Sequence, residues 1–123
     1  MRFDRQKLGQ AAEAAAAQFL QSQQLNILLR NYRCRMGELD LVAMDSAGTL
    51  VIAEVRLRSR ANYGGGAASV DHRKQRRLIR ASKHLLATRP QLARCAVRFD
   101  VLDLKPDGGD GYRIEWIRHA FVC

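Results

Sequence analysis

The chain has 123 residues, 47% hydrophobic and 27% charged, a composition that predicts one globular domain over residues 1–123 and argues against a disordered chain. Its 21 Lys and Arg against 12 Asp and Glu give a net charge of +9, which favours a polyanionic partner, most simply nucleic acid. No apolar run approaches the length of a membrane span, so we expect no membrane partner.

Three cysteines, Cys34, Cys95 and Cys123, are widely spaced and form no C-x-x-C motif. We interpret them as free thiols of a reducing compartment, not as zinc ligands or a disulfide framework. The start of the chain also lacks the apolar stretch of a secretory signal. The expected location is therefore the cytoplasm.

The first predicted element is a helix that begins after Asp4, which can cap it, and runs to about Gln23. Its apolar residues recur at helical spacing and form one stripe, which consists of Leu8, Ala12, Ala15, Ala16, Phe19 and Leu20. Glu13 lies at the border of this stripe, beside Leu20 and Ala16. From there its carboxylate could reach over the edge of the sheet.

Three strands are predicted next, at about residues 26–35, 37–45 and 49–58. The last two are joined by Asp45-Ser46-Ala47-Gly48. If residues 46–48 form a three-residue loop with Gly48 in the left-handed position, Asp45 pairs with Thr49. Counting back then places Asp40 opposite Glu54 on the same face, with Cβ atoms about 4.5–5.5 Å apart. Because like charges so placed repel, the pair indicates a divalent-metal site.

Two alternatives stay open for this pair. A register shift of one residue would send Asp40 and Glu54 to opposite faces of the sheet. Both acids could also be ordinary solvent-facing residues at the end of a sheet. Gly48 favours the loop that keeps them together, because the last position of such a loop requires a positive φ.

Residues 60–69 contain three consecutive glycines and are predicted to be a loop. A second helix follows from near Asp71 to about Thr88 and stops before Pro90. Apolar and small residues gather on one side of it: Leu78, Ile79, Ser82, Leu85 and Leu86. The opposite side carries Arg73, Arg76, Arg77, Arg80, Lys83 and His84. A single-signed face of this kind suits phosphate binding as well as it suits a solvated surface.

Two strands, near residues 95–104 and 112–118, complete the order αβββαββ. The third strand ends in Glu54-Val55-Arg56-Leu57-Arg58, so Glu54, Arg56 and Arg58 share one face. A carboxylate cluster with a cation two residues later suits metal-assisted phosphodiester hydrolysis, in which the cation offsets charge in the transition state. Arg58 extends this cationic face toward nucleic acid.

Two segments, RNYRCRMGELDL at residues 30–41 and LVIAEVRLR at residues 50–58, resemble the YraN-like family of bacterial proteins. The similarity covers nearly the whole chain. That family is similar to Holliday-junction resolvases and to PD-(D/E)xK nucleases, so the resemblance implies an α/β, restriction-endonuclease-like core with a mixed central sheet flanked by helices. It also implies that Asp40 and Glu54 bind Mg²⁺ or Mn²⁺, with Glu13 as a helix-borne acid near the same site.

The chain departs from this pattern at Arg56, where the family usually has lysine. Arginine stays protonated at any useful pH, so it can bind phosphate but cannot help to deprotonate water. The first hypothesis is a metal-dependent nuclease, with DNA favoured over RNA. The second is a non-catalytic nucleic-acid-binding protein, and the third is a subunit whose basic face meets an acidic protein. Junction resolution would favour a homodimer, since two symmetric cuts need two sites.

Overall fold

The structure is a computed structural model that describes residues 5–58, 70–109 and 111–122. The expected cap at Asp4 and the predicted loop at residues 60–69 lie outside these ranges, as does Cys123. The order αβββαββ is confirmed, with one short 3-10 helix added after the second helix. The elements are α1 (Arg5–Ser22), β1 (Asn26–Cys34), β2 (Gly37–Met44), β3 (Leu50–Leu57), α2 (His72–Thr88), η2 (Pro90–Leu92), β4 (Val97–Pro106) and β5 (Tyr112–Phe121).

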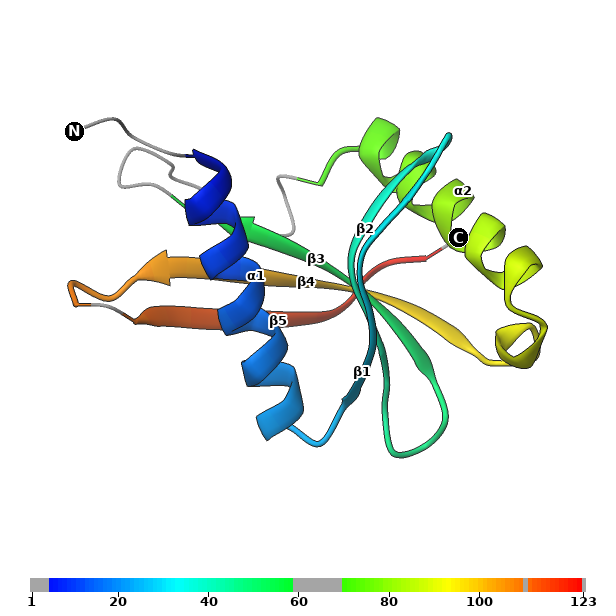
Figure 1. Cartoon of the computed structure of the whole chain (residues 1–123), viewed down its shortest axis with the longest axis horizontal. Helices are drawn as coiled ribbons and strands as arrows, with labels where there is room; N and C mark the ends of the chain where they lie inside the picture. Colours follow the sequence, from blue (N-terminus) through cyan, green and yellow to red (C-terminus); the bar gives the residue numbers. More distant parts are fainter. Residues whose placement is uncertain (1–4, 59–69, 110, 123) are drawn as a thin grey trace.

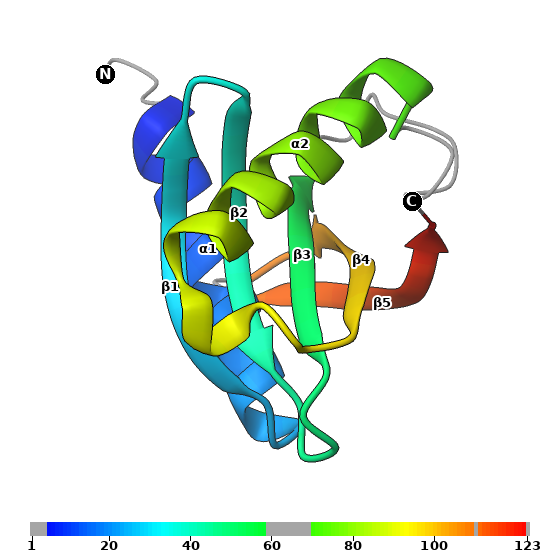
Figure 2. The same cartoon turned by 90° about the vertical axis from the view of Figure 1, so that its right-hand side faces the viewer.

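The strands form one mixed sheet in the order β1-β2-β3-β4-β5, in which only β3 and β4 are parallel. Parallel neighbours need a crossover connection, and α2 lies in the connection between them. The two helices cover opposite faces of the sheet, α1 on one and α2 on the other (Figures 1 and 2). The expected α/β class, a mixed sheet flanked by helices, is confirmed.

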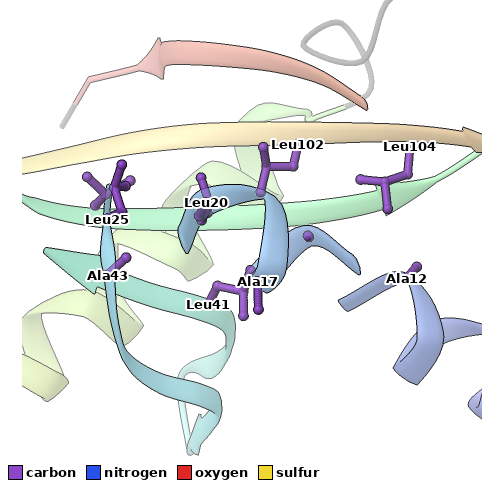
Figure 3. Packing of buried hydrophobic residues seen from close by; sticks show 11 residues of the cluster. Ala12, Ala17, Leu20, Leu25, Leu41, Ala43, Leu102 and Leu104 are labelled. Carbon is purple, nitrogen blue, oxygen red and sulfur yellow. The ribbon is translucent and has the colours of Figure 1, made fainter. Parts of the chain in front are cut away.

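Each face of the sheet has its own apolar core. On the α1 side, Ala12, Ala17 and Leu20 pack on strand residues that include Leu41 and Leu102 (Figure 3). The alanines of α1 let the helix lie close to the sheet. On the α2 side the core is formed by Leu39, Val42, Leu50, Ile52, Leu78, Ala81, Leu85, Phe99 and Val101, among others. Strands buried on both faces explain the continuous apolar runs of β2, β3 and β4.

The β2–β3 turn has the predicted geometry. Gly48 has a φ of +87°, its N–H donates to the Asp45 carbonyl over 3.1 Å, and the Asp45 N–H donates to the Thr49 carbonyl over 3.0 Å. The Asp45 carboxylate also accepts from the N–H groups of Ala47 and Thr49. Downstream pairs such as Met44 with Leu50 and Leu41 with Ala53 follow the same register. The predicted three-residue loop is confirmed, and a one-residue shift is excluded.

Helix α2 begins at a side-chain cap, because the Asp71 carboxylate accepts from the Lys74 N–H over 2.8 Å. Five of the predicted cations are exposed along it: Arg73, Arg76, Arg77, Arg80 and Lys83. The prediction for His84 is wrong, because this residue is half-buried against β1, with its Nδ1 2.5 Å from the Tyr32 hydroxyl. No helix in the described ranges is long and apolar enough to cross a membrane.

The conformation of Gly48 can be tested by substitution. Nothing lies within 4 Å of a Cβ built at this position, so the cost of Gly48→Ala comes only from the left-handed backbone. We expect Gly48→Ala to lower the free energy of unfolding by about 1 kcal/mol, and Gly48→Asn to lower it less. Urea denaturation of the three chains measures this, and equal stability of the alanine variant would contradict the turn.

Candidate functional site

Asp40 and Glu54 meet where the β2–β3 ladder ends. The last paired residues are Leu41 and Ala53, and the next position along each strand carries one of the two acids. Instead of another backbone bond, the Asp40 Oδ2 accepts from the Val55 N–H over 2.9 Å. Asp40 and Glu54 line the same pocket, and the Glu54 carboxyl is one of the groups that raise the pKa of Asp40. The structure therefore brings together the two acids that the register predicts.

The environment of Asp40 disfavours its charged form. Burial, the hydrogen bond to Glu54 and the charge of Glu54 together raise the pKa of Asp40 to about 8, while the Val55 N–H and the Lys74 charge act in the opposite direction. Two carboxylates held this close cannot both ionise cheaply without a cation between or beside them. At neutral pH the pair therefore holds a proton unless another positive charge takes its place.

Asp40 lies where the side-chain alternation of β2 slips. Residues two apart in a regular strand share a face, but Leu39 faces α2 whereas Leu41 faces α1. After Leu41 the alternation is regular, with Val42 facing α2 and Ala43 facing α1. As a result Asp40 lines two pockets, one of about 350 Å³ beside α1 and one of about 220 Å³ beside α2. This carboxyl connects the two sides of the sheet.

On the α1 side, Asp40 is joined by Glu13 and Glu38. One oxygen from each of these carboxylates lies within 4.8 Å of the others. Burial and the charge of Asp40 raise the pKa of Glu13, and a hydrogen bond from Asn31 lowers it. An oxygen cluster of this size and charge suits a hard divalent cation.

Asn31 holds the acids of this cluster in place. With its amide nitrogen turned toward them, the side chain donates to the Glu13 carboxylate over 2.7 and 3.0 Å and to Glu38 Oε1 over 3.2 Å. Asn31 has a φ of +55° in the middle of β1, a conformation that asparagine tolerates better than most residues. The irregular backbone of β1 thus directs a donor at two carboxylates.

On the α2 side, Glu54 is buried at 7% exposure and its Oε2 lies 3.1 Å from the Lys74 Nζ. Lys74 and Arg77 line the pocket together with Glu38, Asp40 and Glu54. Helix α2 approaches β2 closely at Gly37, where an added Cβ would stand 3.6 Å from Arg77. The α2 pocket therefore places cations next to acids.

The sequence predicted Glu13 at the same site as Asp40 and Glu54, but the structure divides these residues. Glu13 lines the pocket beside α1, Glu54 lines the pocket beside α2, and Asp40 lines both, as does Glu38. The cause is the slip of β2 at Asp40, which gives this carboxyl access to both faces. The expectation of one three-acid site thus becomes a two-sided site.

Three residues of the site were not predicted as site residues: Asn31, Glu38 and Lys74. Glu38 lies two residues before Asp40, a spacing that in a strand points to the same face. Lys74 lies one turn before the buried Leu78, so a cation on the sheet-facing stripe of α2 was a readable signal. The amide of Asn31 had no comparable signal, because its role depends on a local backbone conformation.

Arg58 does not belong to the exposed cationic surface. It is 6% exposed, and its Nε donates to Asp103 Oδ1 over 3.0 Å across the β3–β4 pair. A buried guanidinium in such a pair is held by its carboxylate, so the expected phosphate contact of Arg58 has no support. Arg56, two residues earlier, is half-buried on β3.

The model of the uncharacterised protein family UPF0102 matches residues 12–104. A UPF0102 protein of Alcanivorax borkumensis is 48% identical to this chain over 92% of it and 90% of the relative. One from Ralstonia nicotianae is 50% identical, over 92% and 85%, and one from Pseudomonas putida strain GB-1 is 44% identical, over 95% and 94%. The names of these relatives state no activity.

The raised pKa of Asp40 predicts a pH-dependent stability. Its folded-state pKa of about 8 exceeds the usual 3.8, so the stability this group contributes is present at low pH and is lost as pH rises from about 4 through about 8. Asp40→Asn stays neutral, and its amide can still accept from Val55 and donate to Glu54. Without added metal, we expect this variant to be more stable by about 1–3 kcal/mol at pH 8.5 and unchanged at pH 4. Urea unfolding at both pH values measures this difference, and an equal effect at both would contradict it.

Proposed function

The chain belongs to the uncharacterised family UPF0102, which confirms its resemblance to the YraN-like family, and we propose that it is a metal-dependent nuclease that hydrolyses DNA phosphodiester bonds. The observation that carries the proposal is the carboxyl pair of Asp40 and Glu54, which lies beside Glu13 and Glu38 on one side and the start of a basic helix on the other. Branched or single-stranded DNA is the proposed substrate class.

The residues of the site fit a divalent cation. All four acids offer carboxylate oxygens, and the described cluster contains no thiolate or imidazole, a donor set that favours Mg²⁺ or Mn²⁺ over softer metals. The raised pKa of Asp40 shows that its charged form lacks a compensating positive charge. Asp40 would be the shared ligand, with Glu54 on the α2 side and Glu13 on the α1 side, where Glu38 adds a further oxygen.

When bound, such a cation would polarise the scissile phosphate and make a water molecule more acidic. The chain's own groups do the rest. The Val55 N–H orients the Asp40 carboxylate, and the Asn31 amide orients those of Glu13 and Glu38. Arg56, on the same face of β3 as Glu54, would bind the phosphate and offset the charge that develops on it. Arginine in place of lysine at this position is what favours the second candidate, a non-catalytic DNA-binding protein of the same fold.

The exposed cations of α2 supply the contacts to the DNA backbone in this proposal. Arg73, Arg76, Arg77, Arg80 and Lys83 are all exposed, and the helix contains no acid to neutralise them. Contacts of this kind set affinity and position but do not read sequence. The line of cations begins beside the α2 pocket, where Arg77 lies next to Lys74, so a bound backbone would be led toward Asp40 and Glu54.

Cleavage tests the proposal directly. The native chain should cut branched or single-stranded DNA with Mg²⁺ or Mn²⁺ and stop when EDTA is added. Asp40→Asn and Glu54→Gln should each lower kcat by about 100-fold or more, because each removes a charged ligand. Glu115→Gln, which changes an exposed acid of β5, should cut at the native rate.

Two results would contradict the nuclease. Salt-sensitive DNA binding without cleavage under any divalent ion would identify a binding protein. A native chain that fails to bind DNA at low salt would leave the basic face for an acidic protein partner.

The basic face of α2 predicts a salt-dependent affinity. Replacing Arg76 and Arg80 together by glutamine should remove two phosphate contacts. The slope of log K against log salt concentration should therefore become less negative by about 1.4–1.8. The control replaces two exposed cations of the β4–β5 hairpin, Lys105 and Arg113, by glutamine and removes the same charge. Fluorescence anisotropy with a labelled oligonucleotide measures both slopes. An equal decrease in the two variants would show that only net charge matters.

A further inference from the structure

We propose that Lys74 contacts Glu54 and the scissile phosphate at the same time, and so provides the ammonium group that strand β3 lacks at Arg56. This inference rests on the proposed nuclease function and assigns one further residue to its site. The argument begins with position. Lys74 comes from α2 and not from a strand, yet its Nζ lies 3.1 Å from Glu54 Oε2 at the centre of the site.

The ammonium of Lys74 lies between the buried acids and solvent. The Glu54 side chain is 8% exposed, whereas that of Lys74 is 38% exposed. An ammonium has three N–H donors, and the contact with Glu54 occupies one direction only. The side of Lys74 that faces the open α2 pocket is therefore available to an anionic group entering it. A phosphate oxygen is the group that the neighbouring cations of α2 would bring there.

The backbone around Lys74 is fixed on both sides. Its N–H donates to the Asp71 cap over 2.8 Å, and the next residue, Gln75, donates from its side chain to the Val70 carbonyl over 2.8 Å. One turn later the buried Leu78 packs the helix on the sheet. The first turn of a helix also carries a partial positive charge that favours anions. Lys74 is thus held at a defined place, with the helix start adding to its charge.

Two other cations, Arg56 and Arg77, differ from Lys74 in chemistry or in position. Arg56 follows Glu54 by two residues and presents a planar guanidinium, whereas Lys74 presents a compact point charge. Arg77 lines the α2 pocket as well, but its side chain is exposed at the surface. Lys74, in contrast, forms an ion pair with Glu54. Lys74 therefore couples the acids to the phosphate-binding face.

Three variants of the full chain test this role. Lys74→Met removes the charge and keeps an unbranched apolar side chain, Lys74→Arg keeps the charge, and Lys105→Met makes the same change on an exposed lysine that lines neither pocket. With Mg²⁺ and single-stranded or branched DNA, Lys74→Met should lower kcat about 100-fold and change KM by less than about threefold. Lys74→Arg should recover at least about tenfold of this loss, and Lys105→Met should cleave as the native chain does.

A second measurement does not depend on cleavage. Calorimetric titration with Mn²⁺ in the absence of DNA should show binding to Lys74→Met that is about 3- to 10-fold tighter than to the native chain, because a competing positive charge has been removed from Glu54. Lys105→Met should bind Mn²⁺ as the native chain does. If Lys74 had only a structural role, its replacement would instead lower thermal stability and weaken Mn²⁺ binding.

The outcomes separate this inference from the proposed function. Native-like kcat in Lys74→Met, or Mn²⁺ binding no tighter than that of the native chain, overturns the role of Lys74 while the nuclease stands. If the native chain cuts no DNA, the proposed function fails. The contact of Lys74 with the scissile phosphate is then overturned as well. In that case tighter Mn²⁺ binding by Lys74→Met would still support its contact with Glu54, and unchanged binding would overturn that too.

Discussion

The site depends on one constraint, the forced proximity of two carboxyl groups at the end of the β2–β3 ladder. The three-residue turn at Gly48 sets the register, and the register brings Asp40 and Glu54 together. Neither strand can move away, because both are buried on two faces between α1 and α2. Burial, and then the hydrogen bond to Glu54 and its charge, raise the pKa of Asp40, and a nearby positive charge is the simplest way to stabilise both acids in their ionised form.

The two sides of the sheet carry different groups around these acids. On the α1 side, Glu13 and Glu38 add oxygen donors around Asp40, and an amide from Asn31 aligns them. On the α2 side, the ammonium of Lys74 pairs with Glu54. One face thus offers ligands for a cation and the other offers cations for an anion, with Asp40 in contact with both. The proposed metal ion and phosphate group would require this division of charge.

Helix α2 joins the chemistry of the site to the surface of the molecule. Its buried stripe of Leu78, Ala81 and Leu85 anchors it on the sheet, which leaves one lysine directed at the acids and a line of arginines in solvent. Part of the chain's positive charge therefore lies beside the site. The buried pair of Arg58 and Asp103 shows the contrast, since there a guanidinium serves the interior of the sheet.

The sequence by itself determined what depends on local rules. Turn chemistry at Gly48 gave the register of Asp40 and Glu54, and helical spacing gave the basic face of α2. The regular alternation of side chains along a strand did not predict the slip of β2 at Asp40 or the left-handed Asn31 in β1. Both irregularities arise where the strands adjust to each other and to the helices packed on them. Only the tertiary structure separated Glu13 from Glu54, buried Arg58 and brought Lys74 to Glu54. These outcomes depend on which face of the sheet each helix covers. The periodicity of residues within one segment does not determine that face.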